Sequence, residues 1–292
     1  TELAVQSRCK SNKRTKEVAI GSTLSDVFSE LNLEMPYGPI AAKVNNKVEG
    51  MNFRLYHNKD VEFLDMTSGS GSRCYTRTLF FVLSKAVHDL YPGSRVVIDI
   101  PVSNGYYVDL YIGRAVSLED TERIRKRMQE IIDAKMPVRR FEVPTDEAVK
   151  MFEDKGDCAK AKLLRSSGAL YTLYYQIDDY VDYYYGSLLT NTSKLYLFGL
   201  EKYFDGLLLR IPDLKNPGVL PEMTHQDKMF EIFKEHHRWQ DIMGVRTIGD
   251  FNEMVSEGKA TELINVSEAL QEKKIARIAD EIANRKGVKL IL

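Results

Sequence analysis

The sequence predicts an α+β protein with more than one domain, and three observations carry this prediction. At 292 residues the chain is long enough for two domains or slightly more. A hydrophobic content of 43% with 28% charged residues is typical of a globular protein. Short strand-like runs surround one helix in residues 1–67, and a long helix followed by a hairpin occupies residues 73–111. Strands and helices grouped in this way predict an α+β fold.

Residues 1–67 form the first predicted domain. Ser22 or Thr23 can cap its single helix, and Asn45-Asn46 marks a turn between two strands. The order strand, strand, helix, strand, strand is that of a β-grasp, a sheet wrapped on one helix. The strands are predicted at residues 3–9, 16–20, in the two arms of 41–50, and at 60–66, with a polar turn at 10–14 and the helix at 24–31.

A Gly/Ser-rich segment, residues 67–72, is predicted to be a flexible hinge before the second domain, residues 73–211. The helix that follows ends at Pro92-Gly93, and Asn104-Gly105 supplies the positive φ angles of a hairpin turn. Apolar spacing of three and four predicts which face of the helix is buried. That face carries Leu79, Val82, Leu83, Ala86, Val87 and Leu90.

The rest of the second domain alternates helices and strands. An amphipathic helix at 118–135 is predicted to bury Ile124, Met128, Ile131 and Ile132. The remaining predicted elements are a helix capped by Thr145, strands at 170–175 and 180–186, and a hairpin of 195–204 with 206–211.

A helical connector is predicted for residues 212–287. Its helices are expected at 228–243, 250–257 and 265–284. The first should present Met229, Ile232, Phe233, His236, Trp239 and Gln240 on or near one face, and the last should turn Ala269, Ile275, Ile278, Ala279 and Ile282 inward.

Two stretches resemble known protein families. A helix, Tyr91-Pro92, a strand, Asn104-Gly105, a Tyr-Tyr pair and Val108-Asp109 occur in the order found in the second domain of threonyl-tRNA synthetase, the editing module shared with alanyl-tRNA synthetase. The runs VAIGSTLSDVF, AAKVNNKV and KDVEFLD resemble the TGS module that precedes that domain. The resemblance implies a ubiquitin-like β-grasp followed by an editing-like α+β domain.

The editing site of that family holds a zinc ion with an HxxxH pair on the helix and a CxxxH pair on a later strand. The resemblance therefore implies where these four ligand positions fall in this chain. Counting back from Tyr91-Pro92 places the first pair at Arg77 and Phe81. The family motif DxCxGxHxxxT aligns on DYYYGSLLTNT, which places the second pair at Tyr184 and Leu188. Zinc needs thiolate, imidazole or carboxylate donors. We therefore expect a retained fold, no metal site and no catalytic residue.

The replaced side chains suggest two outcomes, and the sequence leaves both open. Arg73 and Arg77 could hold a phosphate or carboxylate, while Phe81 or Tyr184 could stack on a base, with Leu188 as an apolar wall. Alternatively, the same side chains fill the space. Seven tyrosines lie between residues 171 and 185, and sheet packing is favoured over base stacking for them. The acidic cluster Asp178, Asp179 and Asp182 is assigned to the wet face of a strand.

The C-terminal segment predicts a longer parent. Residues 263–292 resemble the approach to the kinase domain in bacterial nucleoside kinases of the uridine kinase type, and the apolar run 288–292 would be the first strand of the missing P-loop domain. No GxxxxGK[ST] phosphate loop occurs in the sequence. ATP and Mg would then bind in the missing domain, with no cofactor in this fragment. The main expectation is a non-catalytic regulatory region whose partners are its own kinase domain and a small-molecule or nucleotide effector.

Composition limits the other partners. The net charge of -1 gives no general attraction to nucleic acid or anionic membranes, and the basic groups at 10–16 and Arg139-Arg140 are assigned to ordinary surface charge. Three scattered cysteines and the lack of a signal peptide or apolar span predict a cytoplasmic protein with reduced thiols and no membrane partner. The alternatives are a tRNA- or RNA-binding module related to threonyl-tRNA synthetase, a zinc-independent aminoacyl-tRNA hydrolase and a homo-oligomerisation arm.

Overall fold

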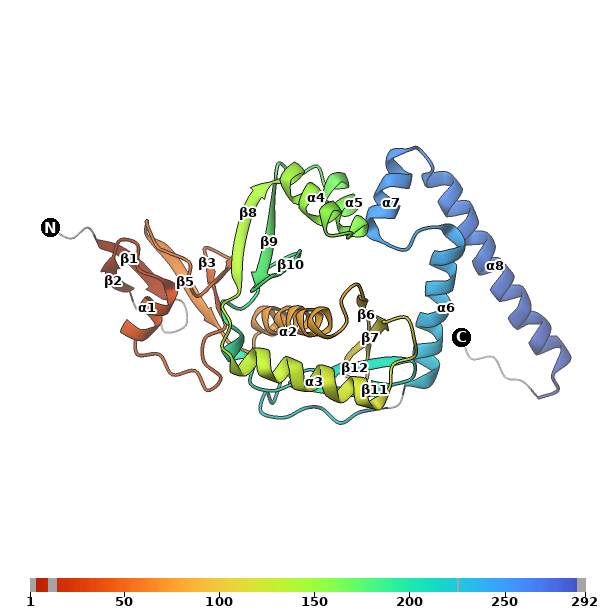
Figure 1. Cartoon of the computed structure of the whole chain (residues 1–292), viewed down its shortest axis with the longest axis horizontal. Helices are drawn as coiled ribbons and strands as arrows, with labels where there is room; N and C mark the ends of the chain where they lie inside the picture. Colours follow the sequence, from red (N-terminus) through yellow and green to blue (C-terminus); the bar gives the residue numbers. More distant parts are fainter. Residues whose placement is uncertain (1–3, 10–14, 225, 288–292) are drawn as a thin grey trace. The chain divides into compact units, whose positions relative to one another are not determined.

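The computed structural model describes residues 4–9, 15–224 and 226–287 and confirms the predicted α+β class (Figure 1). The chain divides into two compact units. The first unit contains residues 1–141 and 173–226, and the second contains residues 142–172 and 227–292. The predicted turn at 10–14 and the predicted strand at 288–292 lie outside the described residues.

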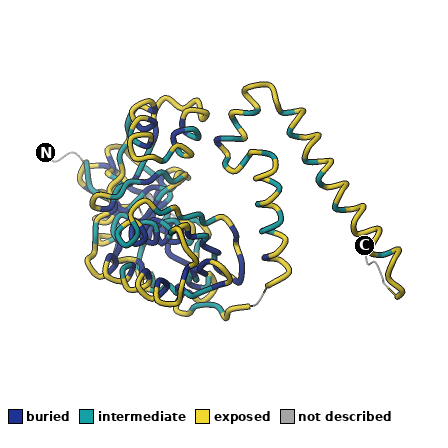
Figure 2. The backbone as a smooth tube through the Cα atoms, turned by 45° about the vertical axis from the view of Figure 1, so that its right-hand side comes forward, coloured by how far each residue is buried: buried dark blue, intermediate teal, exposed yellow. Residues whose placement is uncertain are grey.

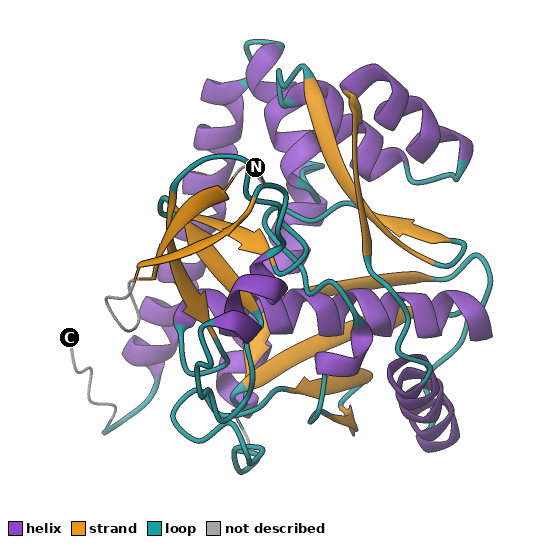
Figure 3. Ribbon diagram, turned by 90° about the vertical axis from the view of Figure 1, so that its left-hand side faces the viewer, coloured by secondary structure: helices purple, strands orange, loops and turns teal. Residues whose placement is uncertain are grey.

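The N-terminal part of the first unit is a β-grasp (Figure 3). Its elements are β1 (Ala4–Cys9), β2 (Thr15–Ala19), α1 (Leu24–Glu30), β3 (Ala41–Val44), β4 (Lys47–Gly50) and β5 (Lys59–Leu64). The sheet order is β2-β1-β5-β3-β4, with β1 and β5 parallel and the other pairs antiparallel. Thr23 caps α1, because its side chain accepts from the Asp26 amide while the Asp26 carboxylate accepts from the Thr23 amide. Buried Leu24 and Val27 attach α1 to the sheet.

A four-stranded antiparallel sheet and two long helices form the second part of this unit. Its elements are α2 (Gly69–Leu90), β6 (Arg95–Val102), β7 (Gly105–Tyr111), α3 (Leu118–Asp133), β11 (Gly199–Tyr203) and β12 (Gly206–Arg210), and the sheet order is β11-β12-β7-β6. The predicted buried face of α3 is confirmed, since all four of its apolar residues are at most 5% exposed. In α2, the predicted buried positions from Leu79 to Val87 are also confirmed. Both helices and the sheet share one hydrophobic core.

A smaller sheet in the order β10-β9-β8 lies beside the C-terminal half of α2, where the ring of Phe81 packs near that of Tyr180. Its strands are β8 (Arg139–Pro144), β9 (Tyr171–Ile177) and β10 (Tyr180–Asp182), and a single 3-10 turn, η1 (Thr192–Lys194), follows. Tyr175 and Ile177 point from β9 into the core shared with α2. The β10 strand is shorter than predicted, since the segment after Asp182 leaves the sheet.

The second unit contains five helices in its described residues: α4 (Thr145–Asp154), α5 (Cys158–Ser166), α6 (Asp227–Met243), α7 (Ile248–Ser256) and α8 (Ala260–Asn284). The α7 helix packs closely on α5, because a Cβ at Gly249 would lie 2.9 Å from the Leu163 amide nitrogen. Lys162 pairs with Asp250 at 2.9 Å and with Glu253 at 2.7 Å across the same contact. The α5 helix was not predicted from the sequence.

The flexible hinge predicted for residues 67–72 is wrong. Ser68 caps α2 by accepting a hydrogen bond from the Gly71 amide at 3.0 Å, and the helix already begins at Gly69. A Cβ at Gly71 would lie only 2.0 Å from the Asp65 carbonyl oxygen. The small residues therefore serve a close approach between α2 and the end of β5, not flexibility.

The predicted hairpin turn is displaced by one residue. Ser103 and Asn104 adopt the positive φ angles, 52° and 54°, and they form the two-residue loop between β6 and β7. Gly105 instead begins β7, where a Cβ would lie 2.5 Å from the Leu209 carbonyl oxygen of β12. Glycine is needed at this position for strand contact and not for the turn.

One prediction about the connector helices is wrong, and it concerns α8. No residue of α8 is buried, and Ile275 and Ile278 are 57% and 41% exposed, so the predicted inward face is open (Figure 2). In α6 the buried residue is Phe230, whereas Met229 and Ile232 are about half exposed. The apolar face of α6 is partly covered, since Lys274 of α8 lies 5.6 Å from the centroid of the Trp239 ring, whereas no described residues cover the apolar face of α8. Thr145 is also inside α4 and does not cap it; its hydroxyl pairs with that of Thr172.

Candidate functional site

The candidate site lies along one stripe of α2. Arg73, Arg77, Phe81 and Lys85 recur every four residues, so their side chains follow each other on one side of the helix. Arg73 is exposed, Arg77 is half-buried, and Phe81 and Lys85 are buried. We use the name zinc-position cluster for Arg73, Arg77, Phe81, Tyr184 and Leu188, the residues at or beside the ligand positions implied by the family resemblance.

The structure brings the apolar members of the zinc-position cluster together. The ring of Phe81 is 5.6 Å from that of Tyr184 and 5.6 Å from that of Tyr180, measured between centroids. Phe81 is fully buried and Leu188 is 3% exposed, and both belong to the main core. Leu188 also borders a cavity of about 20 Å³, close to the volume of one water molecule. Side chains therefore fill most of the space at three of the four ligand positions.

Backbone hydrogen bonding holds the segment carrying Tyr184 and Leu188 against α2. The Leu189 amide donates to Thr78 Oγ1 at 2.9 Å, and this hydroxyl donates to the Cys74 carbonyl at 2.8 Å. The Tyr175 hydroxyl donates to the Gly186 carbonyl at 3.0 Å. These hydrogen bonds hold the segment against α2 and β9.

Arg77 occupies a different environment from the other members. A Cβ at Gly186 would lie 2.8 to 3.1 Å from its Nη1, Cζ and Nη2 atoms, so the guanidinium lies directly on the glycine backbone. Gly186 also has a φ of +111°, which side-chain-bearing residues rarely adopt. Among the described residues, Arg77 has no hydrogen-bond or ion-pair partner, whereas Arg73 donates to Ser70 Oγ at 3.0 Å. The adjacent Tyr185 is 86% exposed.

The titratable side chains of this region are not suitable zinc ligands at neutral pH. Burial raises the pKa of the Tyr184 phenol well above its ordinary value of 10, and the nearby Asp182 carboxylate raises it further, so the phenol is neutral at pH 7. Burial also raises the pKa of the Cys74 thiol to about 11, against the opposing effect of Arg77 and Arg73. Within the described ranges, no group of three or more His, Cys, Asp or Glu residues could hold a metal ion. The donor set required by zinc is not present in this region.

An ion-pair network that the sequence did not predict continues the stripe. Lys85 Nζ lies 2.7 Å from both Asp89 and Asp179 and 3.8 Å from Asp178, and Arg127 of α3 pairs with Asp89 at 2.8 Å. Burial lowers the pKa of Lys85, but its hydrogen bonds to the two carboxylates outweigh this effect and the pKa is raised. The network ties α2 to the β9–β10 turn. The four-residue spacing after Phe81 was the only sequence signal for it.

The assignment of the acidic cluster to a wet strand face needs one correction. Asp178 and Asp179 are about two-thirds exposed, but Asp182 is only 5% exposed. Its Oδ1 accepts from the Tyr183 amide at 2.6 Å, and its Oδ2 lies 3.4 Å from the Tyr180 hydroxyl. Asp182 therefore stabilises the bend where β10 leaves the sheet.

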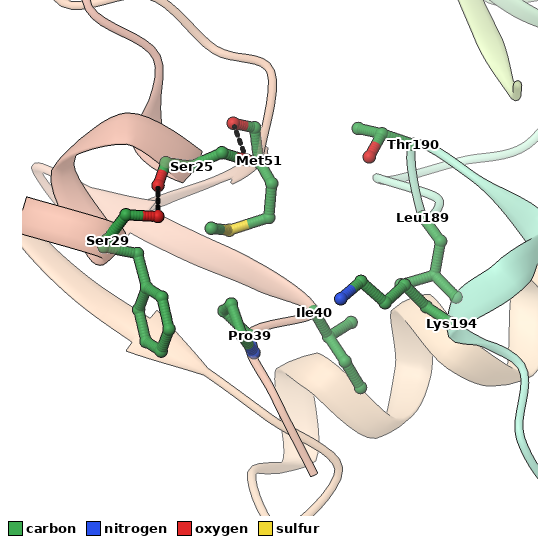
Figure 4. A pocket seen from close by; sticks show the side chains of 9 residues that line it. Ser25, Ser29, Pro39, Ile40, Met51, Leu189, Thr190 and Lys194 are labelled. Atoms are coloured by element: carbon green, nitrogen blue, oxygen red, sulfur yellow. Dashed lines mark hydrogen bonds between the residues drawn. The ribbon is translucent and has the colours of Figure 1, made fainter. Parts of the chain in front are cut away.

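The first unit also contains a cavity of about 260 Å³ (Figure 4). The β-grasp and the second part of the unit each contribute to its wall. It is lined by Ser25, Phe28, Ser29, Pro39, Ile40, Met51, Leu189, Thr190 and Lys194. We use the name seam cavity for this space. The sequence did not predict it, because its lining residues are far apart along the chain.

Comparisons with known proteins agree with the family resemblance in part. No family model matches the chain. Threonine–tRNA ligase of Syntrophotalea carbinolica is 30% identical over 235 residues, which is 76% of this chain and 37% of that protein. The Acetivibrio thermocellus enzyme is 28% identical over 63% of this chain and 29% of its own length, and the Natranaerobius thermophilus enzyme is 31% identical over 62% and 28%.

These relatives limit what can be said about the whole protein. The chain spans well under half the length of each of the three relatives, so it matches only a part of each ligase. Nothing in the comparisons supports the uridine kinase-type parent expected from residues 263–292. None of the helices in the described residues combines the length and apolar character required to cross a bilayer. About three quarters of this chain (76%) is similar to a part of threonine–tRNA ligase.

Proposed function

We propose that this chain is an RNA-binding module, related to threonyl-tRNA synthetase, that lacks zinc-dependent editing chemistry. The relatives are named as ligases of threonine and tRNA, which makes tRNA the first candidate ligand. One observation of the geometry carries the proposal. The half-buried guanidinium of Arg77 lies on Gly186 and has no partner among the described residues.

The surroundings of Arg77 suit a single-stranded RNA end. Arg73 lies one turn earlier on the same stripe of α2, and Tyr185 exposes 86% of its surface next to Gly186. A guanidinium recognises phosphate oxygens through paired donors, and an exposed aromatic ring offers a stacking surface for a base. Two cations with one exposed ring would contact a few nucleotides, which suits a tRNA terminus better than a long duplex.

Hydrolysis of an aminoacyl-tRNA is not part of the proposal. The Cys74 thiol, with a pKa near 11, is almost entirely protonated at neutral pH and is a poor nucleophile. The Tyr184 phenol is neutral for the reasons given above and cannot serve as a base or metal ligand at pH 7. We therefore expect the chain to bind tRNA and to deacylate misacylated tRNA no faster than buffer does.

Fluorescence anisotropy with labelled tRNA at several salt concentrations tests the proposal. The logarithm of the association constant should fall linearly with the logarithm of salt concentration. Arg77→Met should weaken binding and reduce the salt slope by about 1, the value expected for one lost phosphate contact. Arg125→Met is the matched control, because Arg125 is an exposed arginine on α3 that pairs with Glu122.

Two results would overturn the proposal. One is no tRNA binding at low salt, which is also what a regulatory region of a nucleoside kinase would give. The other is an equal effect of Arg77→Met and Arg125→Met, which would mean that the arginine over Gly186 makes no specific contact.

A further inference from the structure

We propose that the seam cavity binds a small organic carboxylate with an apolar body. This inference is independent of RNA binding, because it concerns a different set of residues in the first unit. The cavity combines one cationic side chain, three hydroxyl groups and an apolar wall made by Phe28, Pro39, Ile40, Met51 and Leu189.

The cation is Lys194, at the end of η1. A Cβ at Gly38 would lie 3.9 Å from its Nζ atom, so the side chain reaches from the second part of the unit to the β-grasp. Figure 4 shows the ammonium group directed into the cavity. Among the described residues, Lys194 has no acidic or hydrogen-bonding partner. An unpaired ammonium in a concave site is a natural partner for an anionic ligand group.

The hydroxyl groups divide into acceptors and one donor. Ser25 Oγ donates to the Met51 carbonyl at 3.1 Å, and Ser29 Oγ donates to the Ser25 carbonyl at 3.0 Å. Their oxygens are left as acceptors only. The Thr190 hydroxyl, which has no partner among the described residues, lies on the same side of the cavity as Lys194 (Figure 4). Thr190 and Lys194 are therefore the two donors that this side of the cavity offers to a carboxylate.

The size and charge of the cavity restrict the ligand. Its volume of about 260 Å³ is below the roughly 300 Å³ at which sites for drug-sized ligands begin. A single ammonium group balances a single negative charge. A nucleoside triphosphate is therefore too large for the cavity and carries too many negative charges. The apolar wall requires an apolar body next to the carboxylate.

The cavity is held between two parts that already pack together. Ile40, Leu64 and Met66 of the β-grasp belong to the same hydrophobic core as α2. Arg140 of β8 also pairs at 3.0 Å with Glu49 of β4, whose side chain is 6% exposed. The walls are therefore preformed, and a ligand that contacts both sides should raise the stability of the folded state by mass action.

Titration of the full chain with hexanoate, monitored by amide chemical shifts and by the midpoint of thermal unfolding, tests the inference. Hexanoate carries both required features, inorganic phosphate carries only the charge, and 1-hexanol carries only the apolar body. We expect hexanoate to bind with a Kd on the order of 1 mM, with shifts centred on residues 25–29, 38–40 and 189–194, and a rise in midpoint. Phosphate and 1-hexanol should each bind at least tenfold more weakly.

Two variants locate the binding. Lys194→Met keeps the length of the side chain, removes the charge and should weaken hexanoate at least tenfold, while Lys126→Met, at an exposed lysine of α3, should leave it unchanged. Ser29→Trp, on the exposed side of α1, should block the cavity and abolish the shifts. The inference is overturned if hexanoate does not bind at about 10 mM. It is also overturned if Lys194→Met binds hexanoate like the parent chain, or if phosphate or 1-hexanol binds as well as hexanoate does.

Discussion

The zinc-position cluster and the seam cavity lie in the same unit, and they differ in how side chains use the space. At the cluster, Phe81 and Leu188 are buried in the main core, and the stripe on α2 is fixed by aromatic contacts and by the ion pairs of Lys85. At the seam, Lys194 projects into about 260 Å³ of space and has no partner in the described part of the chain. The comparison teaches that the apolar side chains at the ligand positions implied by the family resemblance pack into the core, whereas the unpartnered cations among the described residues, Arg77 in the cluster and Lys194 at the cavity, are the groups for which we propose ligands.

Phe81→Ala should lower the stability of the chain most, because it removes a fully buried ring from the zinc-position cluster. Loss of the ring leaves a cavity between α2 and the β9–β10 segment, and we expect a destabilisation of about 3–5 kcal/mol. Urea denaturation measures it. The matched control is Phe28→Ala at the seam cavity, where the ring is only partly buried and already borders empty space, so the loss should be clearly smaller. Equal losses at both positions would contradict the description of the cluster as filled.

Lys85→Met should destabilise the chain by about 1–3 kcal/mol near neutral pH, since it removes charge-assisted hydrogen bonds to Asp89 and Asp179. The pKa of Lys85 is raised above 10.5, so its contribution is complete below pH 10.5 and is lost as the pH rises through the raised value. Lys85 lowers the pKa of Asp179 below 3.8, so that contribution is complete above pH 3.8 and is lost as the pH falls through the lowered value.

The difference in unfolding free energy between the parent chain and Lys85→Met, measured by denaturant titration at several pH values, should therefore be flat from about pH 5 to 9 and shrink outside this window. Lys126→Met should show no such dependence. A difference that changes steadily between pH 5 and 9 would show that other titrating groups dominate the link between α2 and the β9–β10 turn.

Gly186→Ala sharpens the account of Arg77. The new Cβ would meet the guanidinium and would also force a side-chain-bearing residue to a φ of +111°, so we expect a loss of about 1–3 kcal/mol and weaker tRNA binding. Gly168→Ala is the control for backbone strain, because Gly168 has a φ of +67° and an added Cβ would meet nothing within 4 Å. If both variants bind tRNA like the parent chain, contact between Arg77 and Gly186 does not position the arginine for RNA.

Thiol alkylation of the native chain should give the smallest effect, because Cys74, which lies on α2 beside the zinc-position cluster, is buried. With iodoacetamide at pH 8, the exposed Cys158 should react, while the buried Cys74, with a pKa near 11, should remain unmodified until the chain is unfolded in urea. Mass spectrometry of the peptides measures both. Alkylation of Cys74 in the native chain at a rate similar to that of Cys158 would show that the region beside Arg77 opens readily.

Local pattern was sufficient for much of the fold. The spacing of Ile124, Met128 and Ile131 predicted the buried face of α3, and the order of strands around one helix predicted the β-grasp. The α8 face was wrong because periodicity shows which side of a helix is apolar and not whether anything covers it. The hinge was wrong because glycine composition does not distinguish flexibility from the close approach of Gly71 to Asp65.

The sequence predicted the position of candidate-site residues only where the family motif could be aligned with this chain. The alignment on DYYYGSLLTNT correctly placed Tyr184 opposite Phe81, but the position of Arg77 on Gly186 depends on a backbone angle that no local pattern specifies. The pairing of Lys85 with Asp179 joins residues distant in sequence, and their charges alone suggested only a solvated surface. The seam cavity could not be foreseen, because it exists only when two separately patterned parts are packed together.

The most direct test of this account measures both ligands on the same two variants. Labelled tRNA and hexanoate are titrated into the parent chain, Arg77→Met and Lys194→Met under identical low-salt conditions. We predict that Arg77→Met weakens tRNA and leaves hexanoate unchanged, and that Lys194→Met weakens hexanoate and leaves tRNA unchanged. If each variant weakens both ligands equally, or neither variant affects either ligand, the division into an RNA-binding cluster and a separate carboxylate cavity is contradicted.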